Sequence, residues 1–413
     1  MRTIRLRVSV LATALPALAI SIVPMLAQEG PAWGQRRNGS FPLIETFKNA
    51  APDNPRWILG GFNNSSGPDP AFLTSGNADP GGNGWLRMTQ LENQPVFLAN
   101  SYAYYDVPFA LGPGLLVSFD FASWGGSGAD GISFYLFDGS TRNFVPGVGA
   151  GALEYAPDGA CTMPGLSNAY GGIGFDDFGN FSGLGCTGGP GAARNSIAIR
   201  GSGNDVTGYN YLTGTSTLPQ TLDFRLAPKR PNQLGPNYRR ATIAITTDLK
   251  VSVAVQFGAR TVPQVLIPPY DLMAAPGQIQ LPPTLKFGFG GSEGGYDNYH
   301  DVRNVVVLPT TSTLSISPDT GKPGDSVKLT GVNFGPNETL YVFVATNFRV
   351  PWYRVSTDVL GQFSATFTLP QRGAGYYELT GIGQSERHCG RLLADSASVT
   401  PPVKRERQLA ILM

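Results

Sequence analysis

Hydrophobic and polar residues alternate in short runs along most of the chain, and clusters of Gly, Asn and Pro separate the runs. Alternation with a period of two is typical of strands that bury one face. It predicts strands over residues 115–121, 221–226, 241–245 and 248–255. Many such strands in one unit imply two packed sheets, so the pattern predicts an antiparallel β-sandwich.

Composition favours the same fold class. The 413 residues include 53 Gly and 34 Pro, which are poor in helix interiors and serve the turns between short strands. Thirty basic residues stand against 29 acidic ones, for a formal net charge of +1. Nucleic-acid binding requires a strongly basic surface, which this balance does not indicate. We therefore expect an all-β protein with no nucleic-acid partner.

The patterned runs fall into two groups. A chain of this length suggests two or three domains. One group covers residues 41–309, and a Ser/Thr-rich linker at 310–313 separates it from a second group over 314–400. Residues 401–413 form a loose tail that is too short to anchor the chain. We expect one large sandwich followed by a smaller β-sandwich domain.

The amino-terminal segment has the layout of a signal peptide. Three arginines among the first seven residues precede an apolar run, 8–26, which two prolines interrupt and which ends beside the small residue Ala27. A single membrane anchor is the alternative, since the run is almost long enough. The prolines favour cleavage, so we predict a signal peptide over 1–27 and a flexible polar leader over 28–40. No later stretch reaches membrane-spanning length, and we expect the mature chain to be secreted or on the cell surface.

The three cysteines fit an exported protein. Cys161 and Cys186 could form a disulfide across the Gly-rich region between them, which would leave Cys389 over. Two free buried thiols would look identical in the sequence.

A Gly-flanked carboxylate is the first candidate for binding chemistry. Gly128-Ala129-Asp130-Gly131 runs directly into the apolar segment 132–137. An ionised Asp only accepts hydrogen bonds, and glycines allow a ligand to approach the backbone closely, so the placement suits hydroxyl recognition. An ordinary Gly-rich turn is the alternative reading of these four residues.

Further segments change this balance. Residues 172–180 and 285–292 follow in the order, and at roughly the separations, found in L-type (legume-type) lectins, and 300–305 resembles the closing strand of that family. Residues 41–309 therefore resemble a bacterial-like variant of the L-type lectin domain, which implies a concanavalin-like jelly roll. Residues 314–400 resemble small Ig-like domains of bacterial surface proteins, which implies a spacer or adhesion module.

The lectin resemblance implies a sugar site. Asp130, after a cis peptide bond, would accept hydrogen bonds from sugar hydroxyls, and the Asn180 amide would donate to the sugar. Phe178 would form an apolar floor, although a core Phe is the alternative. Gly151 would offer a backbone N–H from a Gly-rich loop. Ser292 lies in the variable loop that sets sugar preference in the family.

The metal site is where the sequence departs from the family. Gly174 and Ser196 stand where members with a transition metal have Glu and His, so no transition metal is expected. Calcium requires about six to eight oxygen ligands. The resemblance gives Asp176, the carbonyl of Phe178 and Asn180 as a weak calcium set. The alternative is a metal-free loop that the proposed disulfide holds.

Enzyme chemistry is not expected. Gly290–Gly294 matches the nucleophile-elbow pattern, but the residues that follow do not predict the required helix. Asp176 and Asp177 are adjacent, so on a strand they point to opposite faces and cannot serve one substrate together. His300 and His388 are the only histidines.

The sequence therefore predicts a non-catalytic carbohydrate-binding protein with a shallow site for a carbohydrate or glycoconjugate. Because such a site binds one sugar weakly, we expect useful affinity to come from several copies of the protein, as in an oligomer, or from repeated sugars. The alternative is a structural or adhesive surface protein that has kept the sandwich and lost sugar and metal binding.

Overall fold

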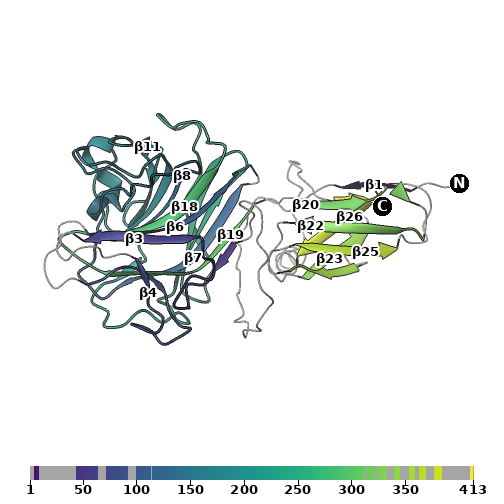
Figure 1. Ribbon diagram of the computed structural model, residues 1–413, viewed down its shortest axis with the longest axis horizontal. Coiled ribbons are helices and arrows are strands. Elements are labelled where there is room, and N and C mark those ends of the chain that lie inside the picture. The colour runs from purple at the N-terminus through teal and green to yellow at the C-terminus, as the bar shows by residue number, and fades with distance from the viewer. Residues whose placement is uncertain are drawn as a thin grey trace, which may run out of the picture. The chain divides into compact units, whose positions relative to one another are not determined.

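The structure is a computed structural model that falls into two units, and each is described by itself (Figure 1). One unit lies within Ala32–Val307, and the other comprises Met1–Pro31 and Leu308–Met413. The structure describes residues 4–8, 43–63, 71–91, 99–112, 114–310, 313–318, 320–321, 324–332, 339–344, 353–358, 362–368, 376–383 and 410–412. Most of the predicted signal peptide, the predicted leader, Cys389 and most of the tail lie outside the described residues.

The larger unit is a sandwich of two nine-stranded sheets, which confirms the predicted fold class. All pairings between its strands are antiparallel except the short pairing of β14 with β7. The first sheet has the order β12 (Thr207–Gly208), β11 (Gly203–Asn204), β9 (Ala169–Asp176), β8 (Gly131–Asp138), β18 (Leu285–Glu293), β6 (Ala99–Phe109) and β3 (Trp57–Asn63), with β10 (Ser196–Arg200) beside β9 and β13 (Tyr211–Gly214) beside β10. The second sheet has the order β17 (Gln264–Asp271), β16 (Lys250–Phe257), β15 (Arg239–Ile245), β7 (Leu115–Trp124), β19 (Tyr299–Leu308), β5 (Leu86–Thr89) and β4 (Phe72–Leu73), with β14 (Asp223–Phe224) beside β7 and β2 (Leu43–Glu45) beside β19.

Alternating burial explains why these segments form strands. In β16, Val251, Val253 and Val255 point into the core between the sheets, and the residues between them are half-buried. In β8 both faces are buried, because one set of residues packs between the sheets and the other set, Tyr135 and Phe137, packs under loops on the far side of the first sheet. The first sheet therefore has a second apolar layer on its outer face, and the candidate site is built on this layer.

One predicted strand is wrong in its extent. Of residues 221–226 only Asp223–Phe224 forms a strand, and the chain then turns. The N–H of Leu226 bonds to the carbonyl of Gly126, and Leu226 is 81% exposed in a left-handed conformation. Alternation alone does not reveal that Leu226 has no partner strand and no core to enter. The runs 115–121 and 241–245 lie within β7 and β15, and most of 248–255 lies within β16, as predicted.

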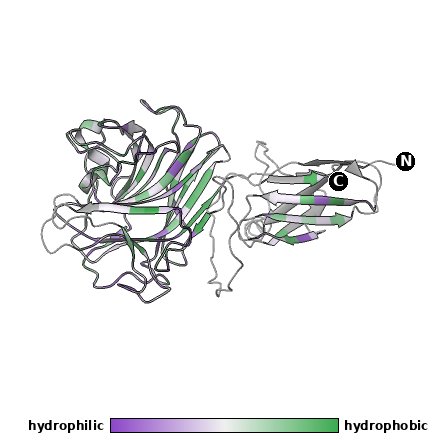
Figure 2. Ribbon diagram, in the orientation of Figure 1, coloured by the Kyte–Doolittle hydropathy of each residue, from purple (hydrophilic) through white to green (hydrophobic). Residues whose placement is uncertain are grey.

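The smaller unit is also built from strands. A three-stranded sheet has the order β20 (Thr313–Ser317), β22 (Ser326–Val332) and β25 (Phe363–Thr368). A six-stranded sheet has the order β21 (Thr320–Gly321), β1 (Ile4–Val8), β27 (Ala410–Leu412), β26 (Tyr376–Gly383), β23 (Thr339–Val344) and β24 (Tyr353–Ser356). The hydropathy colouring in Figure 2 shows apolar stretches on the described strands of both units. The Ig-like assignment and the signal peptide, within which β1 falls, stay predictions.

The described helices are three short 3-10 turns: η1 (Ala150–Ala152), η2 (Asn180–Gly183) and η3 (Gly185–Thr187). Within the part of the chain that the structure describes, no helix is long and apolar enough to cross a membrane.

A buried carboxylate joins the edge of the second sheet to a covering loop. Asp301 on β19 accepts two hydrogen bonds from Arg87 on β5, at 2.9 and 3.1 Å, and one each from Arg230 and the indole of Trp124. Burial raises the pKa of Asp301, but the charges of Arg87 and Arg230 outweigh it and hold the pKa below its usual value. The carboxylate is therefore ionised and fully paired at neutral pH.

Replacing this carboxylate tests the importance of the network. We expect Asp301→Asn to lower the free energy of unfolding by about 3–5 kcal/mol at neutral pH, because the arginines lose their counter-charge. A carboxylate whose pKa is lower in the native state stabilises that state at pH values above its unfolded pKa, and this stabilisation is lost as pH falls. The difference in stability between Asp301→Asn and wild type should therefore shrink below about pH 4. Denaturant titrations at several pH values measure both effects. Asp248→Asn, at an exposed pair with Lys250, is the control that should change nothing; equal stability of Asp301→Asn and wild type would contradict this account.

Candidate functional site

The backbone of Asp130 joins three segments that are distant in the sequence. Its carbonyl accepts hydrogen bonds from the N–H groups of Asp177 and Phe178, at 2.9 and 3.2 Å, just after β9. Its N–H donates to the carbonyl of Ser292 on β18, at 3.0 Å. The peptide bond between Ala129 and Asp130 is cis. The segments that the sequence analysis grouped into one site therefore meet at one end of the first sheet.

The side chain of Asp130 is buried without a donor. It is 3% exposed, and its Oδ2 atom has no hydrogen-bond partner among the residues that the structure describes. A Cβ placed on Gly294 would lie 3.1 Å from this atom, so a glycine leaves the carboxyl room that a side chain would fill. Burial, and then the charge of Asp177, raise the pKa of Asp130 to about 7. An unpaired buried acceptor of this kind can bind a hydroxyl group of a ligand.

Asn180 and Gly151 lie against each other beside this carboxyl. A Cβ on Gly151 would be 2.4 Å from the Cβ of Asn180, so only glycine allows the side chain of Asn180 this position. Asn180 is half-buried, and no hydrogen bond to its amide is formed within the described residues. Ser292, predicted as a ligand contact, is fully buried and donates its hydroxyl to the carbonyl of Ala150 at 2.7 Å. The structure thus gives Ser292 a role in positioning the η1 loop.

Phe178 is held between an aromatic ring and a guanidinium group. Its ring stacks on Tyr296, with centroids 5.4 Å apart and planes 29° apart. The guanidinium carbon of Arg194 lies over the same ring, 4.7 Å from its centroid. Phe178 is half-buried, whereas Tyr296 is 55% exposed. Tyr296 therefore presents more aromatic surface to solvent than the residue that the sequence analysis chose.

Asp176 is engaged within its own loop. Its two carboxylate oxygens accept hydrogen bonds from the N–H groups of Gly179 and Phe181, at 2.6 and 2.7 Å. Burial raises its pKa well above the usual value. Asp176, the Phe178 carbonyl and Asn180 were the weak calcium set, and in this arrangement they fall short of the six to eight oxygens that calcium requires. Among the described residues there is also no group of three or more His, Cys, Asp and Glu that could hold a metal ion.

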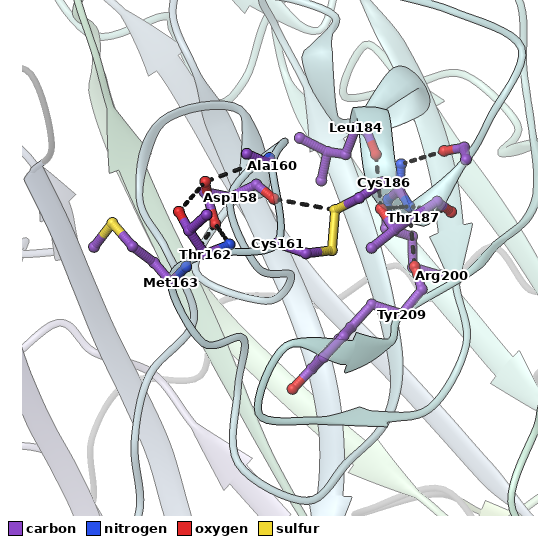
Figure 3. The surroundings of a disulfide bond; sticks show 11 residues. Asp158, Ala160, Cys161, Thr162, Met163, Leu184, Cys186, Thr187, Arg200 and Tyr209 are labelled. Carbon is purple, nitrogen blue, oxygen red and sulfur yellow. Dashed lines mark hydrogen bonds between the residues drawn. A yellow bond between two sulfur atoms is a disulfide. The ribbon is translucent and has the colours of Figure 1, made fainter.

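A buried arginine supplies a positive charge to this loop instead. Arg200 on β10 donates to the carbonyl of Phe181 through Nε and Nη2, at 2.8 and 2.6 Å, and to the hydroxyl of Thr187 at 2.8 Å. It also donates to the carbonyls of Tyr209 and Gly188, at 2.9 and 3.1 Å. Burial lowers its pKa to about 10, opposed by the charges of Tyr155 and Asp176, so it stays protonated at neutral pH. Figure 3 shows Arg200 between Thr187 and Tyr209.

A disulfide fastens the same loop. Cys161 and Cys186 are joined, with Cα atoms 6.0 Å apart and a sequence separation of 25 (Figure 3). On the Cys161 side, Asp158 accepts hydrogen bonds from the N–H groups of Thr162 and Met163, both at 2.6 Å, which closes a tight turn. Arg200 and the disulfide thus hold the segment 181–188 from two directions.

Asp177 points away from Asp176, as the sequence predicts for neighbours at a strand end. It lies between the sheets, where its Oδ2 atom contacts Nε2 of His300 at 3.0 Å and accepts from Asn298 at 3.3 Å. The other ring nitrogen of His300 contacts the hydroxyl of Thr89 at 2.6 Å. His300 is therefore a buried structural residue of β19, and its ring nitrogens do not engage Ser292.

Three residues of the site were missed by the sequence analysis: Arg194, Arg200 and Tyr296. Arg200 carried a signal, because it is a charged residue that ends the buried strand Ser196–Arg200. Tyr296 lies just after the Gly-rich loop 290–295, where an exposed aromatic is a candidate ligand contact. Nothing in the residues near Arg194 indicates that it stacks on Phe178.

Comparisons with known proteins give matches to solved structures at low sequence identity. No family model matches the chain, and no curated protein matches it at a significant level. Among solved structures, the chain is similar to the exoplasmic/lumenal domain of VIP36 in its Ca²⁺/Man-bound form, with 15% identity, TM-score 0.40, and 62% of this chain and 84% of that one covered. Lectin I-B4 from Griffonia simplicifolia in its metal-free form is similar at 16% identity, with TM-score 0.41 and coverage of 65% and 98%. The lectin from Bauhinia forficata in complex with GalNAc is similar at 15% identity, with TM-score 0.42 and coverage of 66% and 100%.

The buried carboxyl of Asp130 should lower stability as pH rises. Its native pKa of about 7 exceeds the unfolded value, so the native state binds more protons and loses stability as pH rises from about 4 to 7. We expect Asp130→Asn, which cannot ionise, to match wild type near pH 4 and to be more stable at pH 8, by up to about 4 kcal/mol. Thermal unfolding across this pH range measures the difference, with Asp248→Asn as control. A variant that is no more stable than wild type at pH 8 would show that the carboxyl is solvated.

Loss of the guanidinium should release the loop that Arg200 holds. We expect Arg200→Met to destabilise the protein by about 3 kcal/mol or more, since buried carbonyls lose a charged donor. Amide hydrogen exchange should quicken over residues 181–188. Arg260→Met, at an exposed arginine, is the matched control. Chelation of wild type with EDTA should leave exchange in this segment unchanged; faster exchange after chelation would mean that a metal ion holds the loop.

Proposed function

We propose that this protein is a secreted or cell-surface carbohydrate-binding protein that holds a sugar in a shallow site without needing a metal ion. Asp130 accepts hydrogen bonds from sugar hydroxyls, the Asn180 amide donates one, and the exposed ring of Tyr296, backed by Phe178, packs against the apolar face of the sugar. Gly151 lets Asn180 reach this position. The smaller unit serves as an Ig-like spacer or adhesion module in this proposal.

The observation that carries the proposal is the unpaired Oδ2 atom of Asp130. A buried carboxyl without a donor destabilises the native state, and such groups are found at functional sites more often than elsewhere. Here the group lies near the η1 loop, since a Cβ on Gly294 would lie 3.1 Å from Oδ2 of Asp130 and 3.2 Å from Cβ of Ala150. Asn180, whose amide forms no hydrogen bond within the described residues, packs against Gly151 of that loop. The exposed ring of Tyr296 stacks on Phe178, whose N–H donates to the carbonyl of Asp130. An acceptor, a donor and an apolar surface at one place suit a sugar, which presents hydroxyls along its edges and C–H groups on its face.

The neighbouring carboxyls favour binding over glycoside hydrolysis. Hydrolysis requires two carboxyl groups on opposite sides of the scissile bond. The oxygens of Asp176 are bonded to backbone N–H groups, and Asp177 is turned between the sheets toward His300. Neither is therefore placed to act with Asp130 on one substrate.

The loop contacts support metal independence. A calcium ion would orient loop carbonyls and the Asn side chain, and in this chain the fixed charge of Arg200 binds the carbonyls of Phe181 and Gly188. If calcium does bind, Asp176, the Phe178 carbonyl and Asn180 are the residues that would hold it, and chelation reveals this.

A glycan array with and without EDTA tests the proposal. We expect wild type and Asp248→Asn to bind the same set of glycans, and Asp130→Asn to lose at least tenfold of the signal, because a hydrogen bond to a charged acceptor is worth about 1.5–3 kcal/mol. EDTA should not change the result. Multivalent display is needed, since one shallow site binds weakly.

Two outcomes would contradict the proposal. If wild type binds no glycan, the sandwich is a structural or adhesive module. If Asp130→Asn binds as wild type does while its unfolding curve shows the expected gain at pH 8, the sugar lies elsewhere on the molecule.

A further inference from the structure

Beside the proposed sugar site lies an arginine whose backbone is fixed by the same loop. The N–H of Ala193 donates to the carbonyl of Gly179 at 2.9 Å, and the N–H of Asn195 donates to the carbonyl of Asp177 at 3.3 Å. Arg194 is therefore held between two residues that pair with the segment on either side of Phe178. A Cβ on Gly179 would lie 2.5 Å from the nitrogen of Arg194, so a glycine permits this close pairing.

The guanidinium group of Arg194 is also fixed. Its Nη2 atom donates to the carbonyl of Gly128 at 3.1 Å, two residues before Asp130, and its carbon lies 4.7 Å from the ring centroid of Phe178. This one bond to Gly128 leaves most of the five N–H donors of the group unused. The side chain is exposed, and within the described residues it forms no ion pair. The site thus has a pre-oriented positive group facing solvent.

The charges around Arg194 leave it available to an anion. Within the described residues, none of the ion pairs involves Arg194. Its exposed guanidinium group is therefore open to a ligand from solvent.

A second arginine, Arg225, also lies close to Gly128. A Cβ on Gly128 would be 2.9 Å from Cδ of Arg225, whose guanidinium lies 3.5 Å from Asp223. Arg225 is thus paired with Asp223, whereas Arg194 has no ion-pair partner among the described residues.

We propose that Arg194 binds the carboxylate of an acidic sugar whose hydroxyls are held by Asp130 and Asn180. A guanidinium group presents paired N–H donors that match the two oxygens of a carboxylate, which a neutral sugar lacks. The ligand class is therefore saccharides with a carboxylate, as in uronic acids and sialic acids. This inference rests on the proposed function, because it assigns the specificity of the same site.

Matched pairs of glycans test the inference on the full-length protein. The array carries uronic-acid oligosaccharides with their carboxyl-reduced counterparts, and sialylated glycans with their desialylated counterparts. We expect wild type to bind the acidic member of at least one pair about tenfold or more above its neutral partner. The pair that responds identifies the source of the carboxylate.

Variants of Arg194 distinguish specificity from a structural role. Arg194→Gln should reduce acidic binding to the level of the neutral partner, whereas a purely structural role would lower acidic and neutral binding by the same factor. Arg194→Lys should keep part of the preference, because it retains the charge without the paired donors. Arg260→Gln is the control and should bind as wild type does. Binding of the acidic member should weaken with added salt.

The outcomes separate the two proposals. Equal binding of acidic and neutral partners, or an unchanged preference in Arg194→Gln, overturns the acidic-sugar inference, while loss of signal in Asp130→Asn in the same array keeps the sugar site. If wild type binds no member of any pair, both proposals fail.

Discussion

The backbone of Asp130 is the connection on which the site depends. Its carbonyl holds the segment after β9, and its N–H holds the end of β18, so three stretches of chain share one residue. The two strands that leave this point, β8 and β18, pair along eight residues and pack on the core between the sheets. The position of Asp130 is thus set by two long paired strands of the sandwich. Its burial opposes folding, and that large core supplies the stability to tolerate it.

The loop over residues 179–188 is stabilised by a buried arginine and a disulfide. Residues 179–188 contain no carboxylate, and their carbonyls would be left without donors wherever water is excluded. Arg200 satisfies several of them from the floor of the loop, and the disulfide closes its outer end. The guanidinium group of Arg200 is part of the chain, so its contacts to these carbonyls do not require a bound ion.

The sequence predicts the strands of this structure better than it predicts the side chains of the candidate site. Alternation finds β7, β15 and β16. In β16 buried residues alternate with half-buried ones, whereas β7 and β15 are buried at nearly every residue. It fails over 221–226, where alternation continues into a turn whose cause is a tertiary hydrogen bond from Leu226. Motif spacing brings Asp130 and Phe178 together, since they lie next to the ends of the neighbouring strands β8 and β9. The roles of Arg194 and Tyr296 could not be predicted, because each depends on a contact across the loop with Phe178.

The charged groups around the candidate site act together on a ligand. A site that buries carboxyl groups would ordinarily repel an anionic ligand. Arg225 is paired with Asp223, whereas Arg194 forms no ion pair within the described residues. Because the guanidinium group of Arg194 is already bonded to the carbonyl of Gly128, a ligand that binds it would immobilise little further side-chain freedom. In the proposed site, Asp130 binds hydroxyl groups and Arg194 selects for a charged saccharide, so affinity and selectivity depend on separate side chains.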